Sequence, residues 1–339
     1  MKRLFFLTAI AVLLGVASAA AQQIAVVSEG GETSVYQTFQ AAIEGADPGS
    51  VIYLPGGSFP ISDDVKITKK ITIIGIGHKI DGENVDGITT ISGNIWFNEA
   101  SSCSAIIGCY ITGNVIIGAN DAEVNNIFIK CCNLNAVQIM NNHCNETIVN
   151  QNYIRSTSDF GGSNGQISNN IISSLKNMQN GKISYNIFLN YYRVPSGYSY
   201  NEYCVSVSTS TIHNNVFIPG DHYSSSWVHL IISGNDNIIY SNLYKKEVSL
   251  EEEPLNVNNA DWNDVFVNFN NGSISPNSNF HFKEDYIQYE NQVGVYANGV
   301  DFDKQIAPVP YIVAKRIDQE TDAAGRLKIQ VRVKSGAGE

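Results

Sequence analysis

One pattern of apolar and polar positions recurs along the chain. Each copy has an aliphatic residue, two free positions, Asn or Cys, one free position and a large apolar residue. The Asn or Cys positions of successive copies lie 23, 20, 18, 16, 29 and 27 residues apart. Spacings near 20 with occasional insertions indicate a solenoid in which each repeat adds one supersecondary unit. The copies are Ile106-x-x-Cys109-x-Ile111, Ile129-x-x-Cys132-x-Leu134, Val149-x-x-Asn152-x-Ile154, Ile167-x-x-Asn170-x-Ile172, Ile183-x-x-Asn186-x-Phe188, Ile212-x-x-Asn215-x-Phe217 and Ile239-x-x-Asn242-x-Tyr244.

The residue types in these copies favour strands. Most of the apolar positions hold β-branched or aromatic residues, and the repeats are too short for long helices. We therefore predict an all-β, parallel β-helix, a single-stranded solenoid of about ten coils stacked about 4.8 Å apart. Parallel crossovers favour the right-handed form. Asn side chains in one column can hydrogen-bond from coil to coil. The expected structural ladder comprises Cys109, Cys132, Asn152, Asn170, Asn186, Asn215 and Asn242.

The two ends of the repeat array carry different patterns. Residues 36–46 have apolar positions at helical spacing with Thr38 as a candidate N-cap, which predicts a helix that caps the first coil. From Glu251 the repeat degrades, and we expect residues 265–269 and 293–296 to form closing coils. Alternating residues near 311–317 and 327–333 predict a C-terminal β-hairpin that covers the last coil. Its outward basic residues, among them Lys328, Arg332 and Lys334, are typical of a solvated edge.

The first residues of the chain have the pattern of a secretory signal. Lys2 and Arg3 precede an apolar run that ends at Val16, and small residues follow up to Ala21. No later stretch reaches the roughly 18 apolar residues of a membrane span. The predicted organisation is a signal peptide at 1–21, a capped β-helix at 22–300 and a hairpin or tail at 301–339. We expect a secreted, extracellular or periplasmic protein, which could associate with the outer surface, without a transmembrane segment.

The charge and the cysteine content limit the classes of partner and cofactor that we expect. The chain has 21 basic and 32 acidic residues, a formal net charge of −11, which disfavours nucleic acid as a partner. A polyanionic ligand would need a local basic groove or bridging Ca²⁺, for which the sequence shows no clear site. Six cysteines occur without a CxxC pattern, so no metal site and no cofactor are predicted. The sequence leaves the pairing of the cysteines and the oligomeric state open.

A resemblance adds to the fold prediction. The stretch from Tyr36 to Gly77 contains Phe39-Gln40-x-Ala42-Ile43, Asp47-Pro48-Gly49-Ser50, Ile52-Tyr53-Leu54-Pro55-Gly56 and Ile71-Thr72-Ile73-Ile74-Gly75. It resembles the opening of the pectin-lyase-like superfamily, which includes pectate lyases, pectin methylesterases and uncharacterised secreted β-helix proteins. The resemblance implies a right-handed parallel β-helix. It leaves the activity open, because function depends on sites that differ between members of one fold.

The catalytic motifs of the enzymes of this superfamily are missing. Asp159-Phe160-Gly161 lacks the middle of the methylesterase motif, and Arg193-Val-Pro195 is followed by Tyr198 where pectate lyases have a second Arg. The paired carboxylates of the galacturonan hydrolases do not occur in their motifs. A lyase would need a cation and a basic residue. The catalytic candidates for such an enzyme are Lys130, Arg155, Asp159 and Arg193.

Aromatic residues gather where the repeat spacing is longest. Tyr and Trp rings offer flat apolar faces with polar rims, which suit the C–H faces of sugars, and loops often carry binding sites. The alternative is that these rings pack the loops onto the rod. We predict a non-catalytic protein that binds polysaccharide or a cell-surface glycan; the alternatives are a lyase or hydrolase acting on a uronate-containing glycan, and a rod that displays loops as an adhesin. The ligand-binding candidates are Tyr191, Tyr192, Tyr198, Tyr200, Tyr203, Tyr223 and Trp227.

Overall fold

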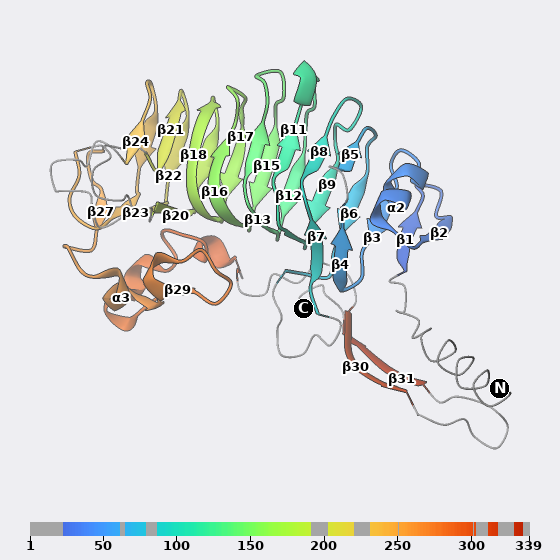
Figure 1. Ribbon diagram of the computed structural model, residues 1–339. Helices are drawn as coiled ribbons and strands as arrows, with labels where there is room; N and C mark the ends of the chain where they lie inside the picture. Colours follow the sequence, from blue (N-terminus) through green and yellow to red (C-terminus); the bar gives the residue numbers. More distant parts are fainter. Residues whose placement is uncertain are drawn as a thin grey trace, which may run out of the picture.

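The computed structural model shows a parallel β-helix with additional segments at both ends (Figure 1). It describes residues 23–61, 65–78, 87–190, 203–219, 231–249, 251–300, 302, 311–317 and 329–334. The predicted signal segment lies outside these residues. The all-β class, the capping helix and the C-terminal hairpin predicted from the sequence are confirmed.

Most coils contribute a strand to each of three faces, which we call sheets 1, 2 and 3 in the order in which the chain meets them; two long strands run through both sheet 2 and sheet 3, and the last coils lack a sheet 3 strand. Sheet 1 contains β3 (Val51–Tyr53), β6 (Thr72–Ile74), β9 (Ala105–Ile107), β12 (Phe128–Lys130), β15 (Thr147–Asn150), β17 (Gly165–Ser168), β19 (Lys182–Ser184), β22 (Thr211–His213) and β25 (Ile238–Tyr240). Sheet 2 contains β4 (Gly57–Pro60), β7 (Thr89–Ser92), β10 (Tyr110–Ile111), β13 (Asn133–Leu134), the first parts of β16 (Tyr153–Asp159) and β18 (Ile171–Gln179), β20 (Ile187–Asn190), β23 (Val216–Pro219), β26 (Leu243–Tyr244) and β27 (Leu255–Asn256). Sheet 3 contains β5 (Val65–Ile67), β8 (Ile95–Phe97), β11 (Val115–Ile117), β14 (Val137–Ile139), the second parts of β16 and β18, β21 (Val205–Ser208) and β24 (Ile232–Ser233).

The repeated apolar positions pair in register and form the core. On sheet 1, Ile106 pairs with Ile129 and Ile129 with Val149, and the same column continues to Ile239. On sheet 2 the last position of each copy points inward, and the rings of Phe188 and Phe217 stack with centroids 5.1 Å apart. Because equivalent positions lie above one another, each coil buries its apolar residues against the coils before and after it.

The polar column of the repeat is a buried hydrogen-bonded ladder. The Asn170 Oδ1 atom accepts hydrogen bonds from the backbone nitrogen and Nδ2 of Asn152, and the Oδ1 atom of Asn186 accepts the same pair from Asn170. The pattern continues through Asn215 to Asn242. At the end of the column, the two carboxylate oxygens of Glu251 accept from the backbone nitrogen and Nδ2 of Asn242. Glu251 thus takes the place that a further Asn would occupy.

The cysteines continue this column toward the N-terminus. The backbone nitrogen of Cys132 donates to Asn152 Oδ1 at 2.8 Å, and Cys109 lies one coil earlier. Both side chains are fully buried, and burial raises the pKa of the Cys132 thiol to about 12. None of the six cysteines, all of which the structure describes, forms a disulfide. Cys109 and Cys132 therefore fill the column as small protonated side chains.

A sharp turn precedes the ladder position in each coil. The residue before the ladder residue has a left-handed backbone, as at Gln151 with φ 56° and Tyr185 with φ 58°. A left-handed conformation costs a residue other than glycine about 1–2 kcal/mol. The ladder holds the backbone in this conformation from coil to coil. The same column contains Gly108, Cys131, Gln151, Asn169, Tyr185, Asn214 and Ser241.

The N-terminal cap follows the sequence prediction. Helix α2 (Phe39–Gly45) begins after Thr38, whose side-chain oxygen accepts a hydrogen bond from the Ala41 backbone nitrogen at 3.2 Å. Strand β1 (Ile24–Val27) pairs antiparallel with both β2 (Thr33–Tyr36) and β3. Since β1 occupies the outer edge of β3, the first strand of the parallel part of sheet 1 does not present an open edge.

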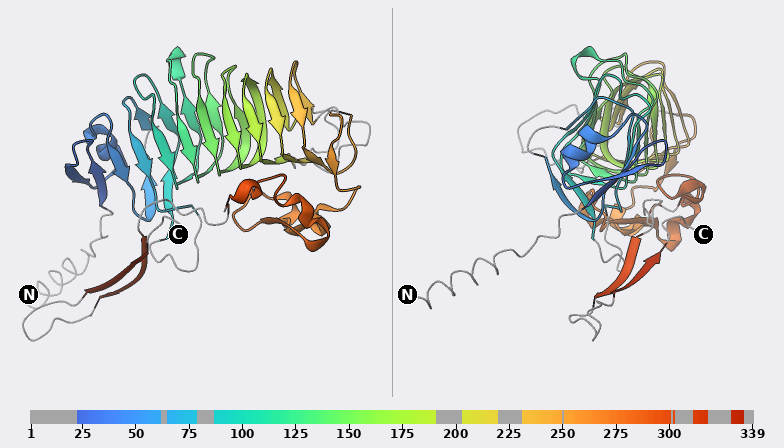
Figure 2. Two further views of the ribbon diagram at one scale, coloured as in Figure 1. Left: turned by 180° about the vertical axis from the view of Figure 1, so that it is seen from behind. Right: turned by 90° about the vertical axis from the view of Figure 1, so that its right-hand side faces the viewer.

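The C-terminal segment folds back along the outside of sheet 2 (Figures 1 and 2). The outward column of sheet 2 is apolar and buried from Tyr153 through Leu243. It packs against residues 257–302, which contain helix α3 (Trp262–Val265) and the antiparallel strands β28 (Phe266–Asn268) and β29 (Asn279–Phe282). The result is a second hydrophobic core outside the solenoid. Its covering residues include Val257, Trp262, Val265, Phe266, Phe269, Phe280, Phe282, Val293, Val295, Tyr296 and Phe302.

This arrangement corrects the prediction for residues 265–269 and 293–296, which form no closing coils. The coil stack of the described chain ends at β27, and these residues instead cover an apolar outer face. The predicted hairpin is formed by β30 (Tyr311–Ile317) and β31 (Ile329–Lys334), which pair antiparallel. It lies near β4, at the opposite end of the stack from β27, and so does not cover the last coil (Figure 1).

Candidate functional site

Among the described residues, the outward column of sheet 3 carries a hollow that could hold a ligand. Strand pairing places one outward residue per coil in a single line across the sheet. The line begins with a cation and two apolar residues and becomes polar from Gln138 onward. In chain order it contains Lys66, Trp96, Ile116, Gln138, Asp159, Lys176, Ser206 and Ser233.

A hollow of about 550 Å³ lies over the polar half of this column. Residues from four successive sheet 3 strands line it, so it runs across the strands and along the axis of the solenoid. Amide and hydroxyl side chains supply most of its polar groups, while the half-exposed Met140 supplies an apolar wall. The lining is Gln138, Ile139, Met140, Asp159, Gly161, Gly162, Asn177, Met178, Gln179, Ser206, Val207, Ser208 and Gly234.

Asp159 is the only carboxylate among the described residues that line the hollow. Its Oδ2 atom lies 3.2 Å from the ammonium nitrogen of Lys176. Its Oδ1 atom accepts hydrogen bonds from the backbone nitrogen of Gly161 and from Asn177 Nδ2, each at 3.0 Å. Both carboxylate oxygens therefore already have partners. The described lining contains no second acid or base that could act with Asp159 in hydrolysis.

The structure does not bring the sequence-predicted catalytic candidates together. Lys130 lies on the outer face of sheet 1, where it pairs in register with Asn150, whereas Asp159 lies on sheet 3. Arg155 follows the sheet 2 part of β16. Arg193 lies outside the described residues. Three of the four candidates therefore sit at different positions around the coil and do not face one groove.

Arg155 has structural contacts that occupy its guanidinium. Its Nη1 atom donates to Asn133 Oδ1, and its Nη2 atom donates to the carbonyl oxygens of Ile111 and Thr112 at 3.0 and 3.2 Å. The guanidinium also lies over the Tyr110 ring, 5.1 Å from its centroid. Partial burial lowers the pKa of Arg155. These contacts make Arg155 a brace between neighbouring coils.

Most of the predicted aromatic site lies outside the described residues. This applies to Tyr191, Tyr192, Tyr198, Tyr200, Tyr223 and Trp227, while Tyr203 is described and half-buried. Chain order gives only the strands that flank the two insertions. Residues 191–202 connect β20 of sheet 2 to β21 of sheet 3, and residues 220–230 connect β23 to β24. Of the flanking strands, β21 lines the hollow and β24 ends beside the lining residue Gly234.

A second hollow lies at the turn that follows sheet 3 in earlier coils. It has a volume of about 680 Å³, and its lining includes Glu99, Asp121 and Glu123. No group of three or more His, Cys, Asp or Glu side chains in the described part of the chain could hold a metal ion. We therefore assign no metal ion to this acidic lining.

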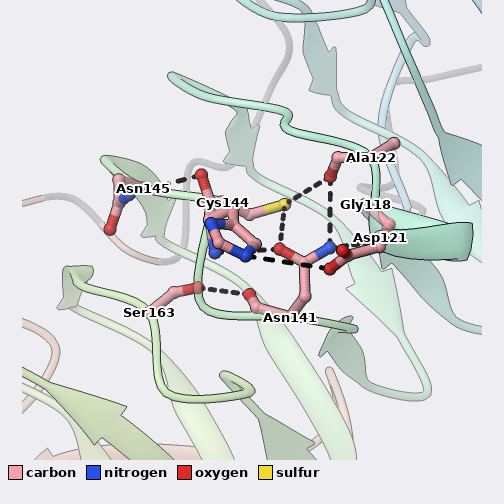
Figure 3. Close-up of polar contacts among 8 residues, drawn as sticks. Gly118, Asp121, Ala122, Asn141, Cys144, Asn145 and Ser163 are labelled. Atoms are coloured by element: carbon pink, nitrogen blue, oxygen red, sulfur yellow. Dashed lines mark hydrogen bonds and ion pairs between the residues drawn. The ribbon is translucent and has the colours of Figure 1, made fainter.

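The polar groups beside this second hollow bind one another (Figure 3). The Asn141 Nδ2 atom donates to the carbonyl oxygens of Gly118 and Ala122 at 2.7 and 3.1 Å. The Cys144 thiol also donates to the Ala122 oxygen, and Ser163 Oγ donates to the Asn141 carbonyl. These contacts fix the turn between coils. We therefore take the hollow on sheet 3 as the candidate site.

Sequence reasoning missed the polar residues of that site. Gln138, Gln179 and Ser206 occupy free positions outside the repeated pattern, so no repeat column identified them. Only the alternation within each sheet 3 strand gave a signal, because residues between two buried neighbours point outward. Val205 and Val207, for instance, are buried on either side of Ser206.

Comparisons with known proteins give no relative. No protein-family model, no curated protein and no solved structure matches the chain. Among the described residues, no helix has the length and apolar character needed to span a membrane. The class that the fold defines is a parallel β-helix with an elongated polar hollow on one outer face.

Proposed function

We propose that this chain is an exported, right-handed β-helix protein of the pectin-lyase-like type that binds polysaccharide on the outer face of sheet 3 without catalysing its cleavage. The observation that carries the proposal is the hollow on sheet 3 that residues of five successive coils line. A hollow that crosses stacked strands suits a polymer, because each added coil repeats the same kind of contact along the ligand.

The chemistry of the lining supports a sugar ligand. Sugar hydroxyls both donate and accept hydrogen bonds, and so do the amides of Gln138, Asn177 and Gln179. Ser206 and Ser208 add hydroxyl groups at the far end of the hollow. The left-handed glycines Gly161 and Gly162, with φ values of 55° and 88°, present backbone without a side chain to the ligand.

The same lining argues against catalysis. Lyase chemistry needs a base and a cation beside the uronate carboxyl, and hydrolysis needs two carboxyl groups. Among the described residues, the hollow offers one carboxylate, which is bound to Lys176 and Asn177. The predicted aromatic residues of the two insertions remain candidates for contacts with the same ligand.

A binding titration on the chain from residue 22 to residue 339 tests the proposal. The matched variants are Gln179→Ala, which removes an exposed amide of the hollow, and Gln166→Ala, which removes an exposed amide on sheet 1. The loss of one hydrogen bond to a neutral group should weaken binding about 3–10-fold in Gln179→Ala and leave Gln166→Ala unchanged.

Two results would count against this function. If no polysaccharide in a broad panel binds, or if both glutamine variants bind like the parent, the ligand does not occupy the hollow. Release of unsaturated sugar products, measured by absorbance with Ca²⁺ present, would instead favour the alternative of a polysaccharide lyase.

A further inference from the structure

The charges of the sheet 3 column bear on the class of polysaccharide. The carboxylate of Asp159, which lines the hollow, forms an ion pair at 3.2 Å with the ammonium of Lys176, its neighbour on the outward column. Their side chains are 24% and 49% exposed, and the one carboxylate that the described lining offers is already paired with this cation. The pair has no net charge. Apart from Asp159, the described polar side chains of the lining are amides and hydroxyls.

A polyuronate would find no counter-charge in this arrangement. Each sugar of such a polymer carries a carboxylate, and a carboxylate that loses water needs a cationic or hydrogen-bonding partner. Lys176 is engaged with Asp159, and Lys66 lies five coil steps from Lys176 along the column. The formal net charge of −11 adds a general repulsion.

A neutral chain matches what the column does offer. Trp96 lies two coil steps before Gln138 on the same line and is half-buried beside Ile116. An indole face can stack on the apolar face of a sugar ring, while the amides and hydroxyls bond its hydroxyl groups. From Trp96 to Ser206 the column spans five coil steps, or about 24 Å at the usual strand spacing.

We infer that the ligand of sheet 3 is a neutral, unbranched polysaccharide that lies along the solenoid axis from Trp96 to Ser206, and that the Asp159–Lys176 pair excludes polyuronates by cancelling the charge that would attract them. This inference rests on the proposed function. The inference predicts that the affinity for the ligand rises with the length of the sugar chain, because a short oligosaccharide reaches only part of the column.

Calorimetric titration with hexasaccharides tests the inference. The neutral probes are cello-, xylo-, manno- and laminarihexaose, and the charged probes are hexagalacturonate and hexaguluronate. We expect at least one neutral hexasaccharide to bind tenfold or more tightly than either uronate, and tighter than its own trisaccharide. The affinity for the neutral hexasaccharide should be the same at about 50 and about 500 mM salt, because the protein forms no ion pair with this ligand that salt could screen.

A pair of charge variants tests the role of the ion pair. Asp159→Asn leaves Lys176 without its counter-charge, and Asp121→Asn removes one negative charge at the second hollow as a control. The ratio of uronate to neutral affinity should rise about fivefold at low salt in Asp159→Asn and remain at the parent value in Asp121→Asn. Melting temperatures of both variants check that the fold is kept.

The outcomes separate the inference from the proposed function. If the parent protein binds a uronate as tightly as any neutral probe, or if the two variants shift the ratio equally, the inference is wrong while polysaccharide binding stands. If no probe of either class binds, the proposed function itself fails. If Trp96→Ala binds the neutral hexasaccharide like the parent, the ligand does not extend over the first half of the column.

Discussion

Sheets 2 and 3 belong to the same coils, yet the chain covers the outer face of sheet 2 and leaves the outer face of sheet 3 open. The outward column of sheet 2 is apolar from Tyr153 to Leu243, and residues 257–302 bury it. The outward column of sheet 3 is polar from Gln138 onward and forms an open hollow. The inward residues are alike on both sheets. The difference teaches that the outward side chains, which the coil pattern leaves free, determine whether a face is covered by the chain or available to a ligand.

The largest effect should come from breaking the cover of sheet 2. Phe266 is fully buried against Trp262, Phe280 and Phe282, with ring centroids 5.0–5.6 Å away. Phe266→Ala should lower the free energy of unfolding by about 3–5 kcal/mol through lost burial and the cavity that remains. Denaturant titration measures the loss. The control is Val267→Ala, which removes a half-exposed side chain on the same strand and should change stability by less than about 0.5 kcal/mol.

A second change concerns the ladder that supports both faces. Asn186→Ala would leave the donors of Asn170 and the carbonyl oxygen of Ile167 without their buried partner. We expect a loss of about 2–4 kcal/mol, because each unsatisfied buried group costs about 1–3 kcal/mol. Asn150→Ala is the control, since that half-buried amide donates to Ser168 on the outer face of sheet 1 and takes no part in the ladder. Equal losses in the two variants would contradict a special role for the ladder.

A reciprocal exchange sharpens the comparison between the faces. Val216→Ser places a hydroxyl in the covered core of sheet 2, where the native side chain is fully buried. It should cost about 1–3 kcal/mol. Ser206→Val puts a β-branched residue on the open face of sheet 3 and should stay within about 0.5 kcal/mol of the parent. Thermal unfolding of both variants measures the asymmetry, and similar shifts would show that the two outer faces are equivalent.

The smallest effect that we expect is a pH dependence of the free energy of unfolding, which comes from Glu251 at the end of the ladder. Burial raises the pKa of Glu251, and its hydrogen bonds to Asn242 oppose this rise only in part. Protonation therefore favours the folded state. The added stability is fully present below the unfolded pKa of about 4.3 and is lost as pH rises through the folded value.

Glu251→Gln imitates the protonated group and should remove this dependence. Its free energy of unfolding, relative to that of the parent, should increase as pH rises from about 4 to about 7. The control is Glu252→Gln, which alters an exposed carboxylate next in the chain. A parent and a Glu251→Gln variant with parallel pH profiles would show that Glu251 is as well solvated in the folded state as in the unfolded one.

Some features followed from the sequence because they repeat at short range. Ile106, Ile129 and Val149 are 20 to 23 residues apart and pair directly, so their spacing alone indicated stacked strands. The Asn column was visible for the same reason. The Thr38 cap was visible because an N-cap bonds a residue within its own first turn.

Other features depended on where the coils place residues that share no pattern. The spacing of Lys130, Arg155 and Asp159 suggested neighbouring coils, but each side chain lies at a different position around its coil. The fold-back of residues 257–302 depends on an outward column that only the completed stack assembles. The sequence by itself thus determined the β-helix and its inward columns, whose contacts join adjacent repeats. Only the tertiary structure decided which outward residues share a face, because the number of residues in each turn sets where the next strand begins and a shift of one residue along a strand turns a side chain from the inside of the coil to the outside.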